Sequence, residues 1–142
     1  MRKRKIAADL YIKDYFHPYV EAGHKEVTPL RIFYHHRWVQ TVHPTVLQYA
    51  MFGISEKGAV FPGRPTKEDV EKHRIIVATL STSRDLYNLQ LGPGYFTHIL
   101  LDEAAQAMEV ETIMPLALAH SNTRVILAGD HMQVGQHFTV LK

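Results

Sequence analysis

The chain has 142 residues, of which 46% are hydrophobic and 21% charged, and its formal net charge is +2. This composition is typical of a globular domain with a real core, and the small net charge gives no strong general attraction to polyanions. The absence of cysteine excludes a disulfide framework and a thiolate metal site, and no apolar run is long enough to span a membrane.

The N-terminal part combines a basic cluster with a predicted helix. Residues 2–5 are all Lys or Arg, which we interpret as a solvated terminus, although such clusters also serve as nuclear addresses or phosphate contacts. Helical spacing is shared by four residues that follow: Ala7, Leu10, Tyr11 and Tyr15. The pattern predicts a helix that packs its tyrosines into the core and is closed by Pro18 and Gly23.

A short strand is predicted at Leu30–Tyr34, and a run of ring-bearing side chains, His35-His36-Arg37-Trp38, follows it. Such a run can stack on the bases of a nucleic acid. We favour the alternative, an ordinary strand exit with Trp38 as a packing anchor, because burial is the commoner fate of aromatic side chains.

Residues 41–65 begin with an apolar stretch and continue with several glycines and prolines, which predicts a loop or small insertion. Gly53 and Gly58 have the spacing of a phosphate loop, and so do Gly58 and Gly63. Neither pair is followed by the Lys and Ser or Thr that such a loop needs for its phosphates and Mg²⁺. We therefore exclude a phosphate loop here.

A capping box, a strand and a hydroxyl-rich segment follow. Thr66 and Asp69 have capping-box spacing, which predicts a short helix to about His73, and Ile75–Leu80 reads as a buried strand. Hydroxyl side chains at a strand's end suit phosphate or sugar contacts, or they cap the next helix. The candidates for nucleic-acid contact are Thr79, Ser81 and Thr82.

Two apolar runs, Thr97–Leu101 and Arg124–Ala128, are short, continuous and rich in branched residues. This pattern is typical of parallel strands covered on both faces, and ligands bind at the carboxyl ends of such strands. Four polar residues that follow the two runs should therefore lie near one edge: Asp102, Glu103, Asp130 and Gln133.

Adjacent carboxylates at the end of a strand can perform chemistry. Asp102 can hold Mg²⁺, and Glu103 can orient or deprotonate a water for attack on a phosphate. The alternative is a solvated acidic pair that begins the next turn. Beyond it, acidic residues at Glu109 and Glu111 predict a helix that starts near Glu111, which would leave Pro115 in its first turn.

The sequence DEAAQ at 102–106, followed by LAGDHMQ ending at Gln133, resembles motifs II and III of superfamily 1 helicases, in the branch of the nonsense-mediated-decay RNA helicase. The resemblance covers roughly residues 6 to 133. It implies an α/β fold: a partial RecA-like, P-loop NTPase-type three-layer sandwich with a mostly parallel sheet, whose phosphate-loop strand is missing. It also implies ATP and Mg²⁺ as cofactors and RNA as partner.

The resemblance assigns roles to individual residues. It implies that Asp102 binds Mg²⁺ and that Glu103 acts on the attacking water. It implies that Gln133 senses the γ-phosphate and that Gln106 links the nucleotide and nucleic-acid sites. The other residues implied at the nucleotide are Gly129 and Asp130. The segment with Thr79, Ser81 and Thr82 matches one beside the nucleic-acid track.

Residues 1–142 are predicted to form a single partial RecA-like domain with a basic terminus at 1–5 and a divergent tail at 134–142. The phosphate loop and the second RecA-like domain are absent, so we expect a fragment of an ATP-dependent RNA helicase motor without ATP turnover of its own. Whether it is an enzyme stays open, and the alternative is a catalytically inactive RNA- or protein-binding fragment. We expect a cytoplasmic and/or nuclear location.

Overall fold

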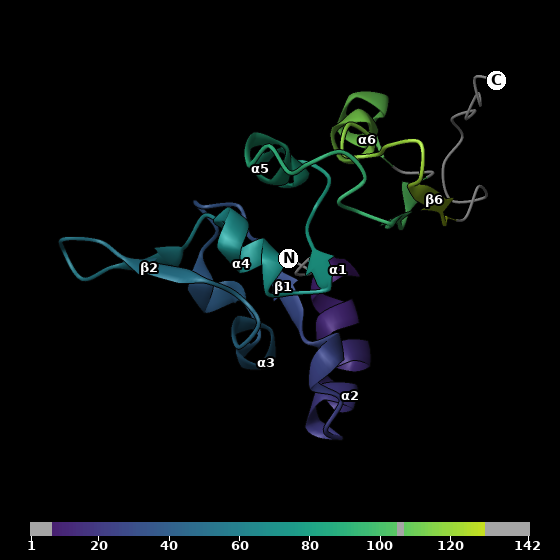
Figure 1. Cartoon of the computed structure of the whole chain (residues 1–142). Coiled ribbons are helices and arrows are strands. Elements are labelled where there is room, and N and C mark those ends of the chain that lie inside the picture. The colour runs from purple at the N-terminus through teal and green to yellow at the C-terminus, as the bar shows by residue number, and fades with distance from the viewer. Residues whose placement is uncertain (1–6, 105–106, 130–142) are drawn as a thin grey trace. The chain divides into compact units, whose positions relative to one another are not determined.

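The computed structural model describes residues 7–104 and 107–129 (Figure 1). The chain divides into two compact units, Met1–Asp85 and Leu86–Lys142. Within the described residues, helices alternate with short strands that form three two-stranded sheets, two of them parallel. The mixed α/β class with small parallel sheets is thereby confirmed, whereas the single domain over 1–142 stays a prediction.

The first helical stretch turns a different face to the core from the one predicted. Its three segments are α1 (Ala7–Leu10), the π-helical η1 (Tyr11–Phe16) and α2 (His17–Glu21). Ile12 and Val20 are buried and Phe16 packs beside them, while Tyr11 and Tyr15 are 45% and 57% exposed. The core tyrosines were therefore predicted wrongly. The wide π turn, whose amides bond to carbonyls five residues back, shifts the buried face to positions four residues apart.

The end of this stretch was predicted in part. Pro18 does not close the helix, because it lies in the first turn of α2, where its missing amide hydrogen costs least. Gly23 ends the helix with φ +103°, a conformation that glycine adopts without steric cost, and its amide donates to the Val20 carbonyl. The short 3₁₀ segment η2 (Lys25–Val27) follows.

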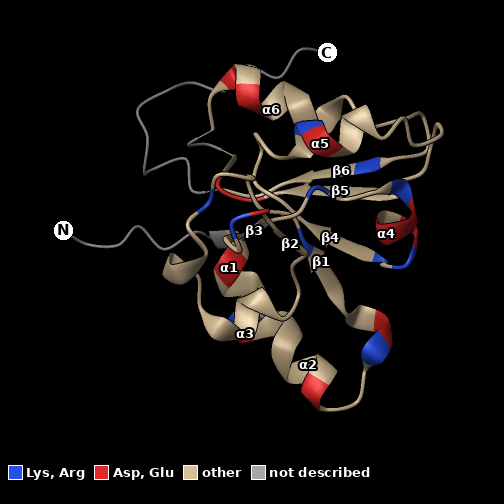
Figure 2. Ribbon diagram, turned by 90° about the vertical axis from the view of Figure 1, so that its left-hand side faces the viewer, with Lys and Arg blue, Asp and Glu red and all other residues tan. Residues whose placement is uncertain are grey.

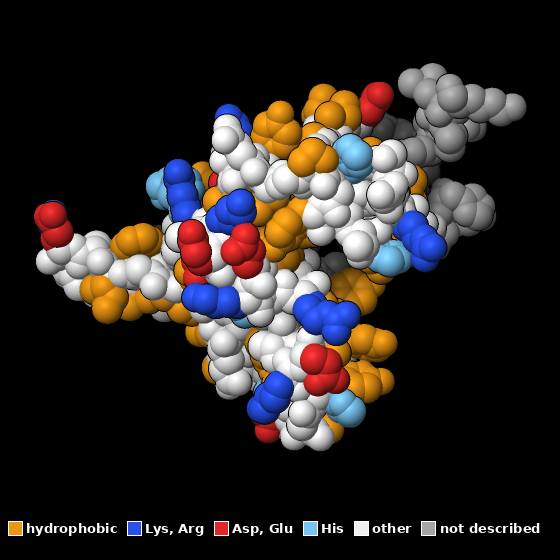
Figure 3. All heavy atoms as spheres, in the orientation of Figure 1, with side chains coloured by type: hydrophobic (Ala, Val, Ile, Leu, Met, Phe, Trp, Pro, Cys, Tyr) orange, Lys and Arg blue, Asp and Glu red, His pale blue; other side chains and the backbone are white. Residues whose placement is uncertain are grey.

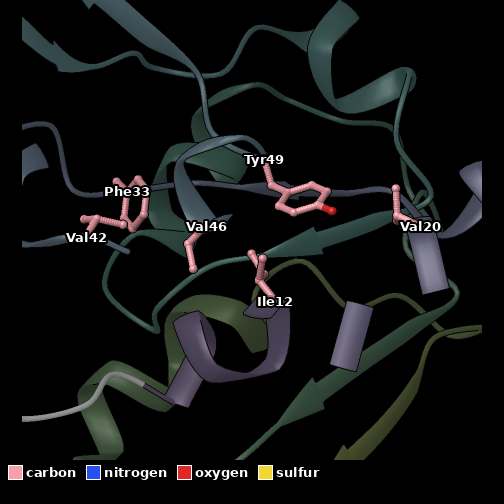
Figure 4. Close-up of a cluster of buried hydrophobic side chains, with 6 residues drawn as sticks. All are labelled: Ile12, Val20, Phe33, Val42, Val46 and Tyr49. Atoms are coloured by element: carbon pink, nitrogen blue, oxygen red, sulfur yellow. The ribbon is translucent and has the colours of Figure 1, made fainter. Parts of the chain in front are cut away.

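Two parallel strands, β1 (Pro29–Arg31) and β4 (Ile75–Val77), form the sheet of the first unit. The amide of Ile32 extends the ladder by donating to the Val77 carbonyl. Both strands lie where the sequence predicted them but end earlier, because a turn begins at Tyr34 and a helix cap at Thr79. Six side chains form the adjacent core (Figure 4): Ile12, Val20, Phe33, Val42, Val46 and Tyr49.

A buried ion pair joins this sheet to α1. The Arg31 side chain is only 1% exposed, and its Nη2 and Nε lie 2.8 Å and 2.9 Å from Oδ1 of Asp9. Its Nη1 donates to the carbonyls of Ile32 and Val77, at 2.8 Å and 3.3 Å. Burial lowers the pKa of Arg31, and the charge and hydrogen bond of Asp9 oppose this shift.

The segment predicted as a loop or small insertion contains regular structure. Its elements are η3 (Val39–Thr41), α3 (Pro44–Leu47) and an antiparallel hairpin of β2 (Phe52–Ile54) and β3 (Val60–Pro62). The Phe61 ring covers Gly53 so closely that a Cβ there would lie 2.7 Å from it. Apolar side chains of the hairpin face solvent (Figure 3).

The predicted capping box is confirmed at α4 (Lys67–Glu71). The Asp69 amide donates to the Thr66 hydroxyl, and the Thr66 amide donates to the Asp69 carboxylate at 3.0 Å. The Thr66 hydroxyl also donates to the Asp69 carboxylate, at 2.7 Å, and this hydrogen bond together with that from the Thr66 amide lowers the pKa of Asp69. Helix α5 (Ser83–Asn88) follows β4.

In the second unit, β5 (His98–Leu101) and β6 (Arg124–Leu127) pair in parallel, as the sequence predicted. Their expected burial on both faces is wrong, since β5 alternates between exposed and buried side chains and β6 is exposed throughout. Leu100, for example, is 70% exposed. The reason is that no third strand pairs with β5 or β6 within residues 7–104 and 107–129, so most of their apolar side chains stay uncovered.

Helix α6 (Glu109–Leu116) carries acidic residues in its first turn, as expected (Figure 2). It begins two residues earlier than predicted, so Pro115 lies inside the helix and not in its first turn. The position is tolerated near the helix end, where only the last turn loses a hydrogen bond. The turn predicted at Gly92–Gly94 is present, with the Tyr95 amide donating to the Gly92 carbonyl.

We predict that Asp9→Ala lowers the free energy of unfolding by about 3–5 kcal/mol, because it leaves the buried Arg31 cation without its partner. The matched control is Asp14→Ala, on the same helical stretch. Its exposed pair with Lys13 is worth at most about 0.5 kcal/mol. Urea unfolding measures both variants, and equal losses would contradict a structural role for the Arg31–Asp9 pair.

We predict that Asp69→Asn destabilises the chain at neutral pH but not in acid. The folded-state pKa of Asp69 is depressed, so its contribution is present above the ordinary aspartate pKa of 3.8 and disappears as pH falls through the lower folded-state value. Thermal unfolding from neutral pH down to acid compares wild type with the variant. A stability difference that stays constant with pH would be evidence against this capping box, and Glu71→Gln at the other end of α4 is the control.

Candidate functional site

The acidic pair Asp102-Glu103 lies at the carboxyl end of the β5–β6 ladder. The Ala128 amide donates to the Leu101 carbonyl at 2.8 Å, and the Ala104 amide donates to the Ala128 carbonyl at 2.9 Å. These two hydrogen bonds bracket the pair, so Asp102 and Glu103 form a two-residue excursion from the ladder. Both side chains are exposed, whereas Leu101 and Ala104 on either side are buried.

Glu103 adopts a left-handed backbone conformation, with φ +52°. For a residue with a Cβ this costs roughly 1 kcal/mol or more, and such strain often occurs at functional positions. The conformation reverses the chain, so that Ala104 returns to bond with Ala128. The backbone therefore fixes where the two carboxylates emerge.

The donor set fits Mg²⁺. Hard cations prefer oxygen ligands, and Mg²⁺ at nucleotide sites uses one or two protein carboxylates, with water and phosphate oxygens completing its shell. Asp102 and Glu103 supply such oxygens at an exposed edge. Among the described residues no group of three or more His, Cys, Asp or Glu side chains could hold a metal by itself. The arrangement thus suits a metal that arrives with a phosphate ligand.

The structure places some predicted site residues together and does not describe others. Gly129 directly follows the end of the β6 ladder, so it lies at the same edge as Asp102 and Glu103. Gln106, Asp130 and Gln133 lie outside the described residues, and their roles stay predictions.

The hydroxyl-rich segment after β4 forms reciprocal hydrogen bonds in the turn that leads into α5. The Thr79 amide donates to the Thr82 hydroxyl at 2.9 Å, and the Thr82 amide donates to the Thr79 hydroxyl at 3.4 Å. Thr82 is buried, whereas Ser81 is exposed with its hydroxyl 3.3 Å from that of Thr79. The hydroxyl groups of Thr79 and Thr82 are thus engaged with each other before α5, as in the capping alternative. Contact of this segment with a nucleic acid stays a prediction.

Trp38 is not the packing anchor that the sequence favoured, because its side chain is 74% exposed. It follows a turn at Tyr34–Arg37 and precedes η3. The anchors of this segment are Phe33 and the Arg31–Asp9 pair. The role of Arg31 was not predicted, although a lone arginine within an apolar strand is a signal for a buried, paired cation.

A shallow pocket of about 450 Å³ lies elsewhere in the second unit. Its lining comes from segments that precede β5 and β6, including Tyr95, Phe96 and His120. It is therefore at the amino ends of these strands, away from the acidic pair, and contains no predicted site residue.

Among the helices that the structure describes, none has the length and hydrophobicity needed to span a membrane.

A family model described as "AAA domain" matches residues 41–135. Over 128 residues the chain is 64% identical to the probable helicase with zinc finger domain of Homo sapiens, covering 90% of this chain and 6% of the relative. It is 46% identical to the human 3'-5' exoribonuclease HELZ2, covering 90% of this chain and 4% of that protein.

Mus musculus RNA helicase Mov10l1 is 45% identical over 65 residues, which are 45% of this chain and 6% of the relative. The chain thus spans about 6% of the length of the first of these relatives. No solved structure matches. The resemblance to helicases, predicted from the DEAAQ and GDHMQ motifs, is confirmed.

We predict that Glu103 is a position where glycine is favoured over valine. Glu103→Gly relieves the left-handed strain, whereas a β-branched side chain increases it, so the two variants should differ by about 1–2 kcal/mol in free energy of unfolding. The control is the same pair of substitutions at Asp102, whose φ is not positive. Denaturant unfolding measures all four, and a valine variant at 103 as stable as the glycine variant would contradict the observed turn.

Proposed function

Since the matching model covers residues 41–135, the chain belongs to the AAA domain family, and we propose that it forms part of an ATP-dependent RNA helicase motor. The observation that carries this proposal is the exposed pair Asp102-Glu103, turned out from the carboxyl end of a parallel β-ladder. Ligands bind at such ends in α/β sheets. The similarity to proteins named as helicases supports it.

In this proposal the chain's residues divide the work on ATP. Asp102 binds Mg²⁺ through a carboxylate oxygen, and Glu103 orients the water that attacks the γ-phosphate and accepts its proton. A Mg²⁺ ion held there would neutralise charge on the phosphate oxygens of ATP. Gly129 and Asp130 approach the nucleotide, Gln133 senses the γ-phosphate, and Gln106 links this site to the nucleic acid.

The proposal includes a finer description of the fold. We infer a partial RecA-like three-layer sandwich with a mostly parallel sheet that lacks the phosphate-loop strand. The parallel pairing of β1 with β4 and of β5 with β6 supports it. A cytoplasmic and/or nuclear location belongs to the same proposal.

RNA contact is proposed for the cap that precedes α5. Ser81 presents an exposed hydroxyl that can bond to a phosphate or a ribose. Thr79 and Thr82 hold the segment in place through their reciprocal hydrogen bonds, and the partly exposed Thr79 adds a second contact. In this arrangement Thr82 acts by positioning its neighbours.

A second candidate is a catalytically inactive fragment that binds RNA or protein. The observation in its favour is that neither GxxxxG segment of the chain continues with the lysine and hydroxyl of a phosphate loop. For the same reason we expect no ATP turnover by this chain alone. Detectable hydrolysis that disappears in Glu103→Gln would contradict this expectation and support the role of Glu103.

We predict that the chain binds ATP with Mg²⁺ and that Asp102→Ala abolishes this binding, because the metal loses its carboxylate ligand. The matched control is Glu109→Ala, which removes an exposed carboxylate from the first turn of α6 and should leave binding unchanged. Isothermal calorimetry measures the three proteins, with a thermal transition to show that each is folded.

Folded wild type that binds no Mg²⁺·ATP would refute the nucleotide half of the proposal and leave the second candidate. Equal loss in both variants would show that general negative charge, and not the ladder-end carboxylate, governs binding.

A further inference from the structure

We propose that the turn after β1 is a stacking platform for the bases of a single-stranded nucleic acid. The platform consists of three ring-bearing residues, Tyr34, His35 and His36, and the exposed Trp38 follows directly after the turn. The Arg37 amide closes the turn by donating to the Tyr34 carbonyl at 2.8 Å. This brings three rings together, with centroid distances of 3.8 Å between the histidines and 4.9 Å and 5.3 Å from Tyr34 to them.

The residues that lead into the platform are buried, whereas rings at the turn are exposed to solvent. Ile32 and Phe33, which lead into the turn, are buried, and Arg37 reaches back to lie 3.5 Å from the Asp9 carboxylate. The rings of Tyr34 and Trp38, by contrast, are 57% and 74% exposed. Rings that are anchored in the exposed state lose little freedom on binding, which favours stacking on a flat ligand.

The chemistry of the platform suits the face of a base. The rings of Tyr34 and His36 are exposed and that of His35 is partly exposed, and the three lie against one another. Stacking on exposed rings is the arrangement used for single strands, because it reads the base face that a duplex hides.

The adjacent strand adds polar groups at the same edge. β1 and β4 are parallel neighbours, so the turn after β1 and the Thr79–Thr82 cap after β4 both follow carboxyl ends of one sheet. The exposed Ser81 hydroxyl suits the sugar–phosphate backbone of a strand whose bases stack on the rings. The inference relies on the proposed function only for the class of ligand, and not on the ATP site.

Another group of exposed rings serves as a comparison. Tyr11, Tyr15 and Tyr19 are exposed along the first helical stretch, but this stretch carries Asp14 and Glu21, and its Lys13 is paired with Asp14. Exposed rings among carboxylates repel a polyanion. Tyr15, which is 57% exposed like Tyr34, is therefore the matched control position.

Trp38 is the only tryptophan of the chain and directly follows the turn, so its fluorescence reports on binding at this segment. We expect a short oligouridylate to quench this fluorescence at low salt, and the effect to weaken as salt is raised. An RNA duplex of the same length should quench much less. Binding without a change in Trp38 fluorescence, or equal quenching by the duplex, would overturn the proposal.

Substitutions at individual rings test which side chains contribute to the binding of the single strand. In fluorescence polarisation with a labelled oligouridylate, we expect Tyr34→Leu and Trp38→Leu each to weaken binding about tenfold, and Tyr15→Leu to leave it unchanged. Circular dichroism shows whether each variant is folded, and His36→Ala provides a further variant with little effect on the core. Unchanged affinity in folded Tyr34→Leu and Trp38→Leu would refute the platform.

The same titration on Asp102→Ala separates this inference from the ATP site. We expect that variant to bind oligouridylate like wild type, because Asp102 is not part of the platform. Loss of nucleotide binding with intact oligouridylate binding would refute the ATP proposal alone. Wild type that binds nucleotide but no oligouridylate would refute the platform alone, and would leave its exposed rings as a surface for a protein.

Discussion

The ion pair between the partly buried carboxylate of Asp9 and the buried Arg31 is the interaction on which the first unit depends. One oxygen of the carboxylate accepts from Arg31 in β1, and the other lies 3.5 Å from Arg37 in the following turn. A helix, a strand and a turn are thus joined at a single side chain. Because an unpaired buried cation is so costly, this arrangement strongly favours one relative placement of the three elements. The turn that carries the stacked rings is thus tied, through Arg31 and Arg37, to a carboxylate that is far from it in sequence.

The acidic pair of the second unit is positioned by different means. Two backbone hydrogen bonds between β5 and β6 residues, and the left-handed conformation of Glu103, determine where the carboxylates emerge. Both side chains are exposed at this edge. A site of this kind keeps its backbone geometry when Asp102 or Glu103 is changed to a residue that tolerates the turn. Substitutions can therefore separate chemistry from folding more cleanly here than at Arg31.

Local patterns predicted the local structure well. The capping box of α4, the parallel strands β4, β5 and β6 and the turn at Gly92–Gly94 depend on residues close in sequence, and all were found. Burial was harder to predict, because it depends on what covers an element. Burial of the tyrosines in the first helix was predicted wrongly because a π segment shifted the buried face. Burial of Leu100 was predicted wrongly because β5 has only β6 as a neighbour among the described strands. The position of Asp102 and Glu103 at a strand end followed from sequence, but the left-handed Glu103 did not, since glutamate has no preference for that conformation.

The exposed apolar side chains of the two units differ in chemistry and therefore in the ligands that they suit. Along β6 the exposed side chains of Val125, Ile126 and Leu127 are aliphatic and lack cations between them, so they specify no ligand beyond another apolar surface. Around the turn after β1 the exposed groups are rings, and a hydroxyl segment follows the neighbouring strand of the same sheet. Rings match the face of a base and hydroxyl groups match the sugar–phosphate backbone, and aliphatic side chains match neither. The chemistry of the exposed groups, more than the area they expose, is therefore what assigns a single strand to the turn and no ligand to the sheet face.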